Sequence, residues 1–142
     1  MQPVLFDTSL YVAALRHRDE GVMTLRRLHT GSVVWLSAVV LEELYAGVGE
    51  RGRAIVERLE RDFDRAKRIL VPSLSDWAST GQVLARLGAK YDYEQIGQGR
   101  LTNDALIAMS AGRLGVRIIT MNERDFRRLA EFRPFHWQVE RF

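Results

Sequence analysis

Short apolar runs alternate along the chain with longer segments whose apolar residues recur every three or four positions. The runs predict strands at residues 4–6, 32–36, 69–71 and 116–120, and a last short strand at 136–139. In the segments between these runs, the spacing of the apolar residues is typical of amphipathic helices. Strand and helix alternate with short connections, which predicts an α/β fold: a mostly parallel, twisted sheet of four to five strands covered by helices on both faces.

Capping residues predict where the first helices begin and end. Thr8 and Ser9 are expected to cap a helix after the first strand, and Ser37 a helix that runs to about Gly47. A charged, amphipathic helix is expected over residues 50–68. Its apolar stripe would consist of Ile55, Leu59, Phe63 and Ala66.

The second half of the chain shows the same kind of signals. Ser75 is expected to cap a helix that ends at Gly88, and Thr102 to begin a helix that Gly115 closes. The unpatterned residues 91–100 predict a loop, and residues 123–129 a short helix. The residues available for burial in the helix after Ser75 are Trp77, Val83, Leu84 and Leu87.

Length and composition indicate one ordinary globular domain over residues 1–142. The apolar share is 46% and the charged share 27%, and no linker, repeat or low-complexity tract divides the chain. With no cysteine, disulfides, thiolate metal sites and cysteine nucleophiles are excluded. No apolar run approaches the ~20 residues of a membrane span, so we expect a cytoplasmic protein without a membrane partner.

The charge balance permits a nucleic-acid partner without establishing one. The 21 Lys and Arg against 18 Asp and Glu give a formal net charge of +3. All but Lys67 and Lys90 among the basic residues are Arg, whose forked donors suit phosphate. In the Arg-rich segment 51–68 acidic residues intervene, which favours a solvated, ion-paired helix face over an RNA-binding one.

Four acidic residues stand near the ends of predicted strands or in the helices that follow. Asp7 follows the first strand directly, and Glu43 lies on the apolar side of its helix, because Val39 and Val40 precede it by four and three residues. Asp104 is expected in the first turn of its helix, and Asp125 five residues after the end of the fourth predicted strand. Parallel strands could bring all four to one edge of the sheet.

Each of these acids also has a structural interpretation. Asp7 could simply cap a helix, Glu43 could be neutralised by Arg partners, and Asp104 could interact with its helix dipole. Asp125 could be another cap or an exposed acid. Together, however, four neighbouring carboxylates repel one another without a cation, and hard oxygen ligands are those that Mg²⁺ or Mn²⁺ prefers. Such a site suits metal-assisted hydrolysis of phosphodiesters.

Other chemistries have little support. His17, His29 and His136 form no ligand-spaced cluster, and no phosphate-binding glycine motif lies between a strand and a helix. Asp7 is not followed by the second Asp of a phosphatase-type nucleophile, although a phosphoacceptor Asp on a receiver-like sheet stays open.

Four short segments follow one another in order along the chain: Leu5-Phe6-Asp7-Thr8-Ser9, Glu43-Leu44-Tyr45-Ala46-Gly47, Thr102-Asn103-Asp104-Ala105-Leu106-Ile107-Ala108 and Thr120-Met121-Asn122-Glu123-Arg124-Asp125-Phe126. Together they resemble the PIN-domain ribonucleases and, within them, the VapC-type toxins of toxin–antitoxin pairs. The resemblance extends over nearly the whole chain and implies a three-layer α/β/α PIN-like fold.

The resemblance also implies an activity. It is that of an endoribonuclease that uses one or two Mg²⁺ or Mn²⁺ ions and leaves 5′-phosphate and 3′-hydroxyl ends. The implied catalytic and metal-binding residues are Asp7, Glu43, Asp104 and Asp125, and the implied supporting polar residues are Thr8, Ser9, Asn103, Thr120 and Asn122. The fourth acidic position varies in this family, and Asn122 stands where some members carry an acid.

The implied partners are RNA, a VapB-type antitoxin and a second copy of the chain in a homodimer. The class of RNA stays open, with transfer RNA one candidate. Two further hypotheses also stay open: an RNA-processing PIN nuclease without an antitoxin, and a non-catalytic module of the same fold that binds RNA or protein.

Overall fold

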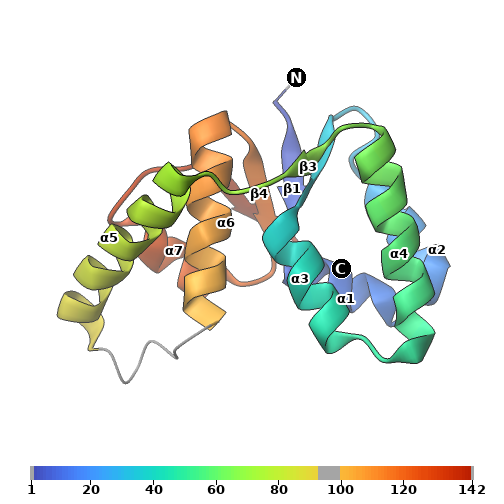
Figure 1. The fold of residues 1–142 in the computed structure, drawn as a ribbon, viewed down its shortest axis with the longest axis horizontal. Helices are drawn as coiled ribbons and strands as arrows, with labels where there is room; N and C mark the ends of the chain where they lie inside the picture. Colours follow the sequence, from blue (N-terminus) through green and yellow to red (C-terminus); the bar gives the residue numbers. More distant parts are fainter. Residues whose placement is uncertain (1, 93–99, 142) are drawn as a thin grey trace.

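A single parallel sheet organises the chain. The computed structural model describes residues 2–92 and 100–141. Within them, five strands pair in the order β3-β2-β1-β4-β5, and every neighbouring pair is parallel. The strands are β1 (Val4–Phe6), β2 (Val34–Ser37), β3 (Ile69–Leu70), β4 (Arg117–Thr120) and β5 (Trp137–Val139). The predicted α/β fold with a parallel sheet is confirmed (Figure 1).

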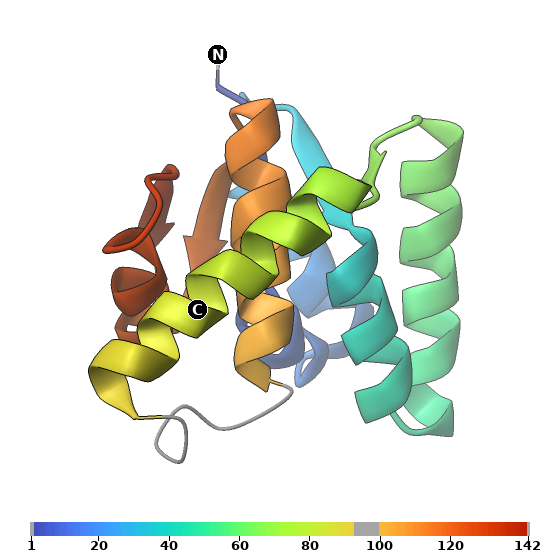
Figure 2. The same cartoon turned by 60° about the vertical axis from the view of Figure 1, so that its left-hand side comes forward.

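Helices cover both faces of this sheet (Figure 2). Helices α1 and α2 lie behind the sheet in this view, and α3, α5 and α6 lie in front of it. Helix α4 packs beside α2 and α3, and α7 beside α5 and α6. The helices of the described residues are α1 (Thr8–Leu15), α2 (Arg18–Arg27), α3 (Ala38–Gly47), α4 (Glu50–Arg65), α5 (Leu74–Tyr91), α6 (Arg100–Leu114) and α7 (Glu123–Ala130).

The strand order creates a reversal point between β1 and β4. The chain proceeds outward from β1 through β2 to β3, then crosses to β4 on the other side of β1 and continues to β5. Leu5 is therefore paired with Trp35 on one side and with Ile118 on the other. In open parallel sheets, ligands bind beyond the carboxyl ends of the strands at such a point. Asp7 follows β1 there, and Met121 follows β4.

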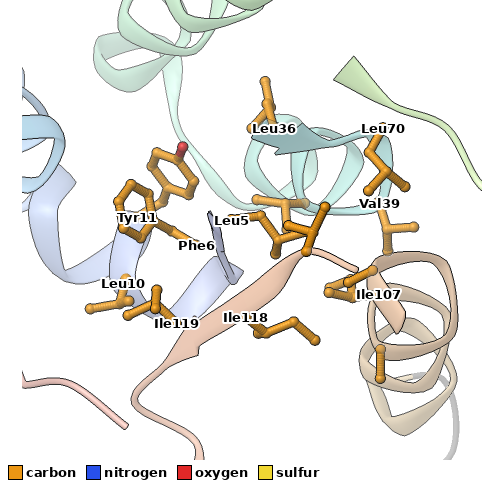
Figure 3. Packing of buried hydrophobic residues seen from close by; sticks show 14 of the residues in the cluster. Leu5, Phe6, Leu10, Tyr11, Leu36, Val39, Leu70, Ile107, Ile118 and Ile119 are labelled. Carbon is orange, nitrogen blue, oxygen red and sulfur yellow. The ribbon is translucent and has the colours of Figure 1, made fainter. Parts of the chain in front are cut away.

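Alternate residues of the central strands pack on opposite faces of the sheet, within one cluster of buried hydrophobic residues (Figure 3). Phe6 contacts Tyr11 of α1 in an edge-on arrangement, with ring centroids 5.8 Å apart. Leu5 is directed to the opposite side of β1, toward Val39 of α3 and Ile107 of α6. All of these residues are buried. Successive side chains of a strand point to opposite faces of the sheet, and the apolar sides of the helices pack against them. The ends of the central strands are therefore held from both faces.

Several helix boundaries differ from those expected. Asp7, not Thr8 or Ser9, is the N-cap of α1, because its carboxylate accepts from the Ser9 backbone amide. Ser73, not Ser75, is the N-cap of α5, where it forms a reciprocal capping box with Asp76.

Two further helix ends in the second half of the chain also differ from the predicted ones. Helix α5 continues to Tyr91, and α6 begins at Arg100 rather than Thr102. The predicted loop over residues 91–100 falls largely on residues 93–99, which lie outside the described residues.

Helix α2 was not predicted, and Gly21 explains why. A glycine in a polar segment argues against a helix by propensity. A Cβ atom at Gly21 would lie 2.0 Å from the backbone oxygen of Ala14, so the close approach of α2 to α1 requires glycine. Tertiary packing therefore outweighs the unfavourable local propensity here.

Two expectations about burial were wrong. Trp77 is 55% exposed on the outer side of α5. Ala66 is exposed because α4 ends at Arg65, and the left-handed residue Lys67 (φ 56°) turns the chain toward β3. Within the described residues, no helix is long and apolar enough to cross a membrane.

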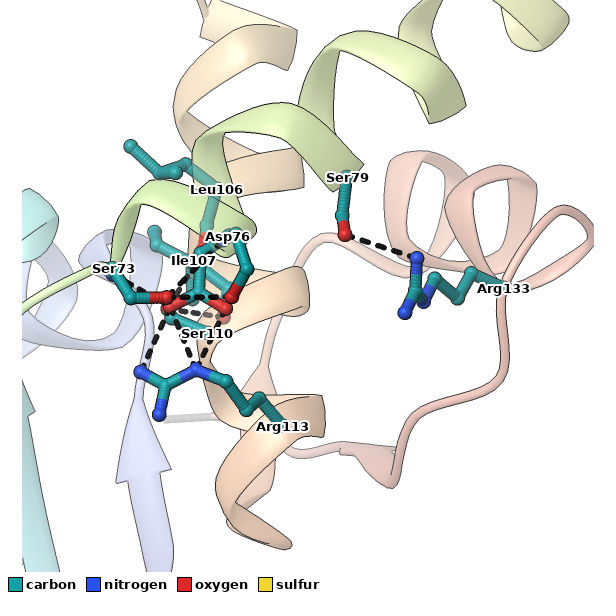
Figure 4. A network of polar contacts seen from close by, with 9 residues as sticks. Ser73, Asp76, Ser79, Leu106, Ile107, Ser110, Arg113 and Arg133 are labelled. Carbon is teal, nitrogen blue, oxygen red and sulfur yellow. Dashed lines mark hydrogen bonds and ion pairs between the residues drawn. The ribbon is translucent and has the colours of Figure 1, made fainter.

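An ion pair between buried Asp76 and the exposed Arg113 joins α5 to α6 (Figure 4). Asp76, 2% exposed, accepts hydrogen bonds of 2.9 and 3.1 Å from Nε of Arg113 and of 2.9 Å from its Nη2. Asp76 also accepts from the Ser73 backbone amide at 2.8 Å. Burial acts to raise the pKa of Asp76, but the hydrogen bonds from Arg113 and Ser73 outweigh it and leave that pKa lowered.

Candidate functional site

A pocket of about 270 Å³ opens at the carboxyl edge of the sheet, where the strand order reverses. Residues of α1, α3 and α6 surround it, together with residues directly after β1, α1 and β4. They are Asp7, Thr8, Ser9, Val12, Ala13, Arg16, Glu43, Asp104, Met121 and Asn122. The structure thus brings three of the four predicted acids, Asp7, Glu43 and Asp104, to one pocket.

Asp7 is the most deeply buried of these acids, at 3% exposed. One carboxylate oxygen accepts from the backbone amide and the hydroxyl of Ser9, and the other accepts from the Thr120 hydroxyl at 2.6 Å. Burial raises the pKa of Asp7, and the hydrogen bonds from Ser9 and Thr120 act against this rise. Asp7 therefore caps α1 and also lines the pocket, so the capping interpretation and the site interpretation hold for the same side chain.

Glu43 meets a hydroxyl instead of a cation. It is half-buried on α3, and its Oε1 accepts from the Thr8 hydroxyl at 2.7 Å. In the part of the chain that the structure describes, Glu43 forms no ion pair. The alternative that Arg partners neutralise Glu43 is therefore wrong, and its charge is directed to the pocket.

Asn122 connects Asp104 to Asp125. Its Nδ2 donates to Asp104 at 3.3 Å and to Asp125 at 3.0 Å. Asp104 is 7% exposed and lies in the second turn of α6, because the helix starts at Arg100, which weakens the expected dipole interaction. Asp125 lies in the first turn of α7 and is half-buried, beside the pocket rather than on its wall.

The predicted supporting residues divide into two groups. Thr8, Ser9, Thr120 and Asn122 each donate a hydrogen bond to one of the acids. Asn103 is half-buried and, within the described residues, donates to none of them. Asn122 is itself held in place, because its backbone amide donates a 2.8 Å hydrogen bond to the Thr120 hydroxyl. This bond links the two supporting residues.

The sequence interpretation missed Val12, Ala13 and Arg16, which bring one side of α1 to the pocket. Their only signal in the sequence is spacing, since Val12 and Arg16 are four residues apart on a helix that begins beside Asp7. Met121 was also missed, although it directly follows the last residue of β4.

The chemistry of the pocket suits a hard divalent cation. Asp7, Glu43 and Asp104 supply carboxylate oxygens to the pocket, and buried Asp7 accepts hydrogen bonds from the neutral hydroxyls of Ser9 and Thr120. Among the described residues, no three acidic or histidine side chains converge as a ready-made cage. Mg²⁺ does not require such a cage, because it keeps several waters and binds proteins through one or two carboxylates. The residues therefore fit this ion by type.

The chain belongs to the PIN domain family. A model of this family, described as the PIN domain, matches residues 4–132. PIN domains are nucleases as a class, and the acidic pocket at the strand ends agrees with that class. A search of curated proteins by sequence gives no match.

Solved structures with the same fold cover nearly the whole chain. DNA-bound VapBC from Salmonella typhimurium matches with 23% identity and a TM-score of 0.69, over 98% of each chain. VapBC2 from Rickettsia felis, bound to a promoter DNA fragment, matches with 22% identity and a TM-score of 0.68, over 99% of this chain and 100% of that one. VapBC-1 from nontypeable Haemophilus influenzae matches with 21% identity and a TM-score of 0.64, over 97% and 98%. At these identities, the likeness concerns the fold.

Proposed function

We propose that the protein is a VapC-type endoribonuclease toxin that hydrolyses RNA phosphodiester bonds with the help of Mg²⁺ or Mn²⁺. The observation that supports this best is the pocket at the reversal of the sheet, with Asp7, Glu43 and Asp104 on its walls. The hydroxyls of Thr8 and Thr120 donate to Glu43 and Asp7, and the side-chain amide of Asn122 donates to Asp104, so neutral donors orient these carboxylates.

Asp7, Glu43 and Asp104 would hold one or two divalent ions, and Asp125 would contribute directly or through water. When bound, such an ion supplies an activated water and stabilises negative charge on the phosphate. Thr120 and Ser9 keep Asp7 oriented toward the pocket, and Thr8 does the same for Glu43. Asn122 holds Asp104 and Asp125 side by side.

We further propose a VapB-type antitoxin as the partner, a homodimer as the assembly and the cytoplasm as the location. The antitoxin is supported by the VapBC complexes among the structures with the same fold, which align over almost the full chain. An RNA-processing PIN nuclease would share the pocket but would have no antitoxin. A search for a small antitoxin gene beside this one distinguishes the two.

The activity is tested by expressing the protein in a bacterial host beside its Asp104→Asn variant and mapping new RNA 5′-monophosphate ends by sequencing. We expect a few sharp sites with the unchanged protein alone, each paired with a 3′-hydroxyl end. Ends with 2′,3′-cyclic phosphate would contradict the mechanism, because they arise from attack by the ribose 2′-hydroxyl. Identical maps for both proteins would favour the non-catalytic module.

The Asp104→Asn variant also separates a ligand from a scaffold role. If Asp104 is a metal ligand, the melting temperature of the variant in chelator should equal or exceed that of the unchanged protein, because repulsion between carboxylates is relieved. A large drop in melting temperature in chelator would favour a structural role.

A further inference from the structure

Arg16 is a cation on the wall of the acidic pocket. It follows the last residue of α1, where its backbone amide donates to the Ala14 oxygen and caps the helix. Its side chain is exposed and lines the same pocket as Asp7, Glu43 and Asp104.

The Arg16 guanidinium has no hydrogen-bond or ion-pair partner in the part of the chain that the structure describes. Because Arg16 is exposed to solvent, its charge stays available to a ligand that enters the pocket. Glu43 instead accepts from Thr8, and Asp7 from Ser9 and Thr120. Arg16 thus lines one side of a cavity of about 270 Å³ as a positive wall, and the carboxylates of Asp7, Glu43 and Asp104 line it as a negative wall. Among the described residues, no ion pair joins the two walls.

A phosphodiester fits between two such walls. The Arg fork donates two parallel hydrogen bonds to phosphate oxygens, a geometry that a point charge does not reproduce. Val12, four residues before Arg16 and 44% exposed, adds an apolar surface beside it on which a ribose or base can lie.

We propose that Arg16 binds a phosphate of the RNA strand and so positions the neighbouring phosphodiester beside the carboxylates. The proposal rests on the proposed function for the identity of its ligand. It makes Arg16 a positioning residue for the substrate and names the RNA backbone, rather than a base, as the group that it recognises.

The test measures RNA binding separately from cleavage. A fluorescein-labelled single-stranded RNA is titrated with the Asp104→Asn protein in Mg²⁺, alone and combined with Arg16→Ala, Arg16→Lys or Arg65→Ala. Binding is followed by fluorescence anisotropy at several salt concentrations, and a gel confirms that the RNA stays intact. Arg65 is the matched control, because it is exposed, lies at the end of α4 and has no partner among the described residues.

We expect Arg16→Ala to weaken binding about tenfold, as for the loss of a charged hydrogen bond. The slope of log Kd against log salt should fall by about 0.7, the value for one phosphate contact on a single strand. Arg16→Lys should keep the slope and restore only part of the affinity, because the charge remains and the fork is lost. Arg65→Ala should change neither quantity, and the melting temperatures of all variants should agree.

If Arg16→Ala binds RNA with the affinity and salt slope of Arg65→Ala, the proposal is overturned. This outcome is separate from a failure of the proposed function. If the unchanged protein cuts no RNA and the salt slope still depends on Arg16, the proposed cleavage is wrong and Arg16 is a phosphate contact of a non-catalytic module. If it cuts RNA and Arg16→Ala matches the control, the cleavage stands and the role of Arg16 falls.

Discussion

The hydroxyl of Thr120 at the end of β4 donates a 2.6 Å hydrogen bond to the carboxylate of Asp7 at the end of β1. Both side chains are buried, and the two strands are neighbours at the reversal of the sheet. The same hydroxyl accepts from the Asn122 backbone amide. One buried oxygen therefore orients an acid of the site and the segment that holds two others.

Replacing Thr120 by Val should destabilise the protein by about 1–2 kcal/mol, because a buried carboxylate loses a donor and a backbone amide loses its acceptor. Chemical denaturation monitored by circular dichroism measures this loss. Thr80→Val is the matched control: the Thr80 hydroxyl is buried without a hydrogen-bond partner in the described structure, so its removal should leave the stability unchanged or slightly higher. Equal losses in both variants would show that the hydrogen bond to Asp7 is not the cause.

The sequence predicted the parts of the fold that depend on local apolar patterns. The buried runs around Leu5, Leu36 and Ile118 became strands, and the stripe through Ile55, Leu59 and Phe63 became one face of α4. Each pattern reports burial directly, because a strand or helix with one apolar face has to cover it.

What escaped prediction depends on contacts between distant segments. Helix α2 has a glycine that only the backbone of α1 explains. Three acids could be assigned to one pocket because parallel strands end at one edge, but nothing in the local sequence placed Arg16 there. The amide bridge from Asn122 to Asp104 spans 18 residues and likewise has no local signal.

Gly21 and Gly81 should respond in opposite directions to substitution by Ala. At Gly21, the added Cβ would overlap the Ala14 carbonyl, so α2 has to move away from α1, and we expect a loss of more than about 2 kcal/mol. Gly81 is exposed in the interior of α5 with nothing near its Cβ position, so Ala should stabilise the protein by about 0.5–1 kcal/mol. Melting curves of both variants check this, and a tolerated Gly21→Ala would mean that α1 and α2 pack less closely.

The ion pair between Asp76 and Arg113 predicts acid sensitivity. Because the pKa of Asp76 is lower in the folded state than in the unfolded one, its contribution to stability is fully present above the unfolded value of about 3.9. It is lost as the pH falls through the lower, folded value. The free energy of unfolding should therefore decrease with acid in that range.

The comparison uses Asp76→Asn, which cannot titrate, and measures unfolding by denaturant between about pH 2 and 6. Near neutral pH the variant should be destabilised by roughly 1.5–3 kcal/mol, as for the loss of hydrogen bonds to a charged group, because the Arg113 side chain that remains is exposed to solvent. Its stability should then depend less steeply on pH than that of the unchanged protein. Parallel pH curves for the two proteins would assign the acid sensitivity to other carboxylates.

Asn122→Asp should make the melting temperature of the protein depend more strongly on divalent ions. The variant keeps a good N-cap for α7 but replaces the amide that donates to Asp104 and Asp125 with a third carboxylate. Like charges at this distance repel, so the melting temperature in chelator should fall. The added carboxylate oxygen is also a hard ligand. Mn²⁺ or Mg²⁺ should therefore raise the melting temperature of the variant by more than that of the unchanged protein.

Asn122→Ser is the control for this experiment, since it keeps the cap and removes the amide without adding charge. It should lose some stability in chelator and show no larger response to Mn²⁺ than the unchanged protein. If Asn122→Asp and Asn122→Ser respond alike to the ion, the acids around residue 122 are not close enough to share it. Asp104 and Asp125 would then serve to fix α6 against α7, and the candidate cation site would be confined to Asp7 and Glu43.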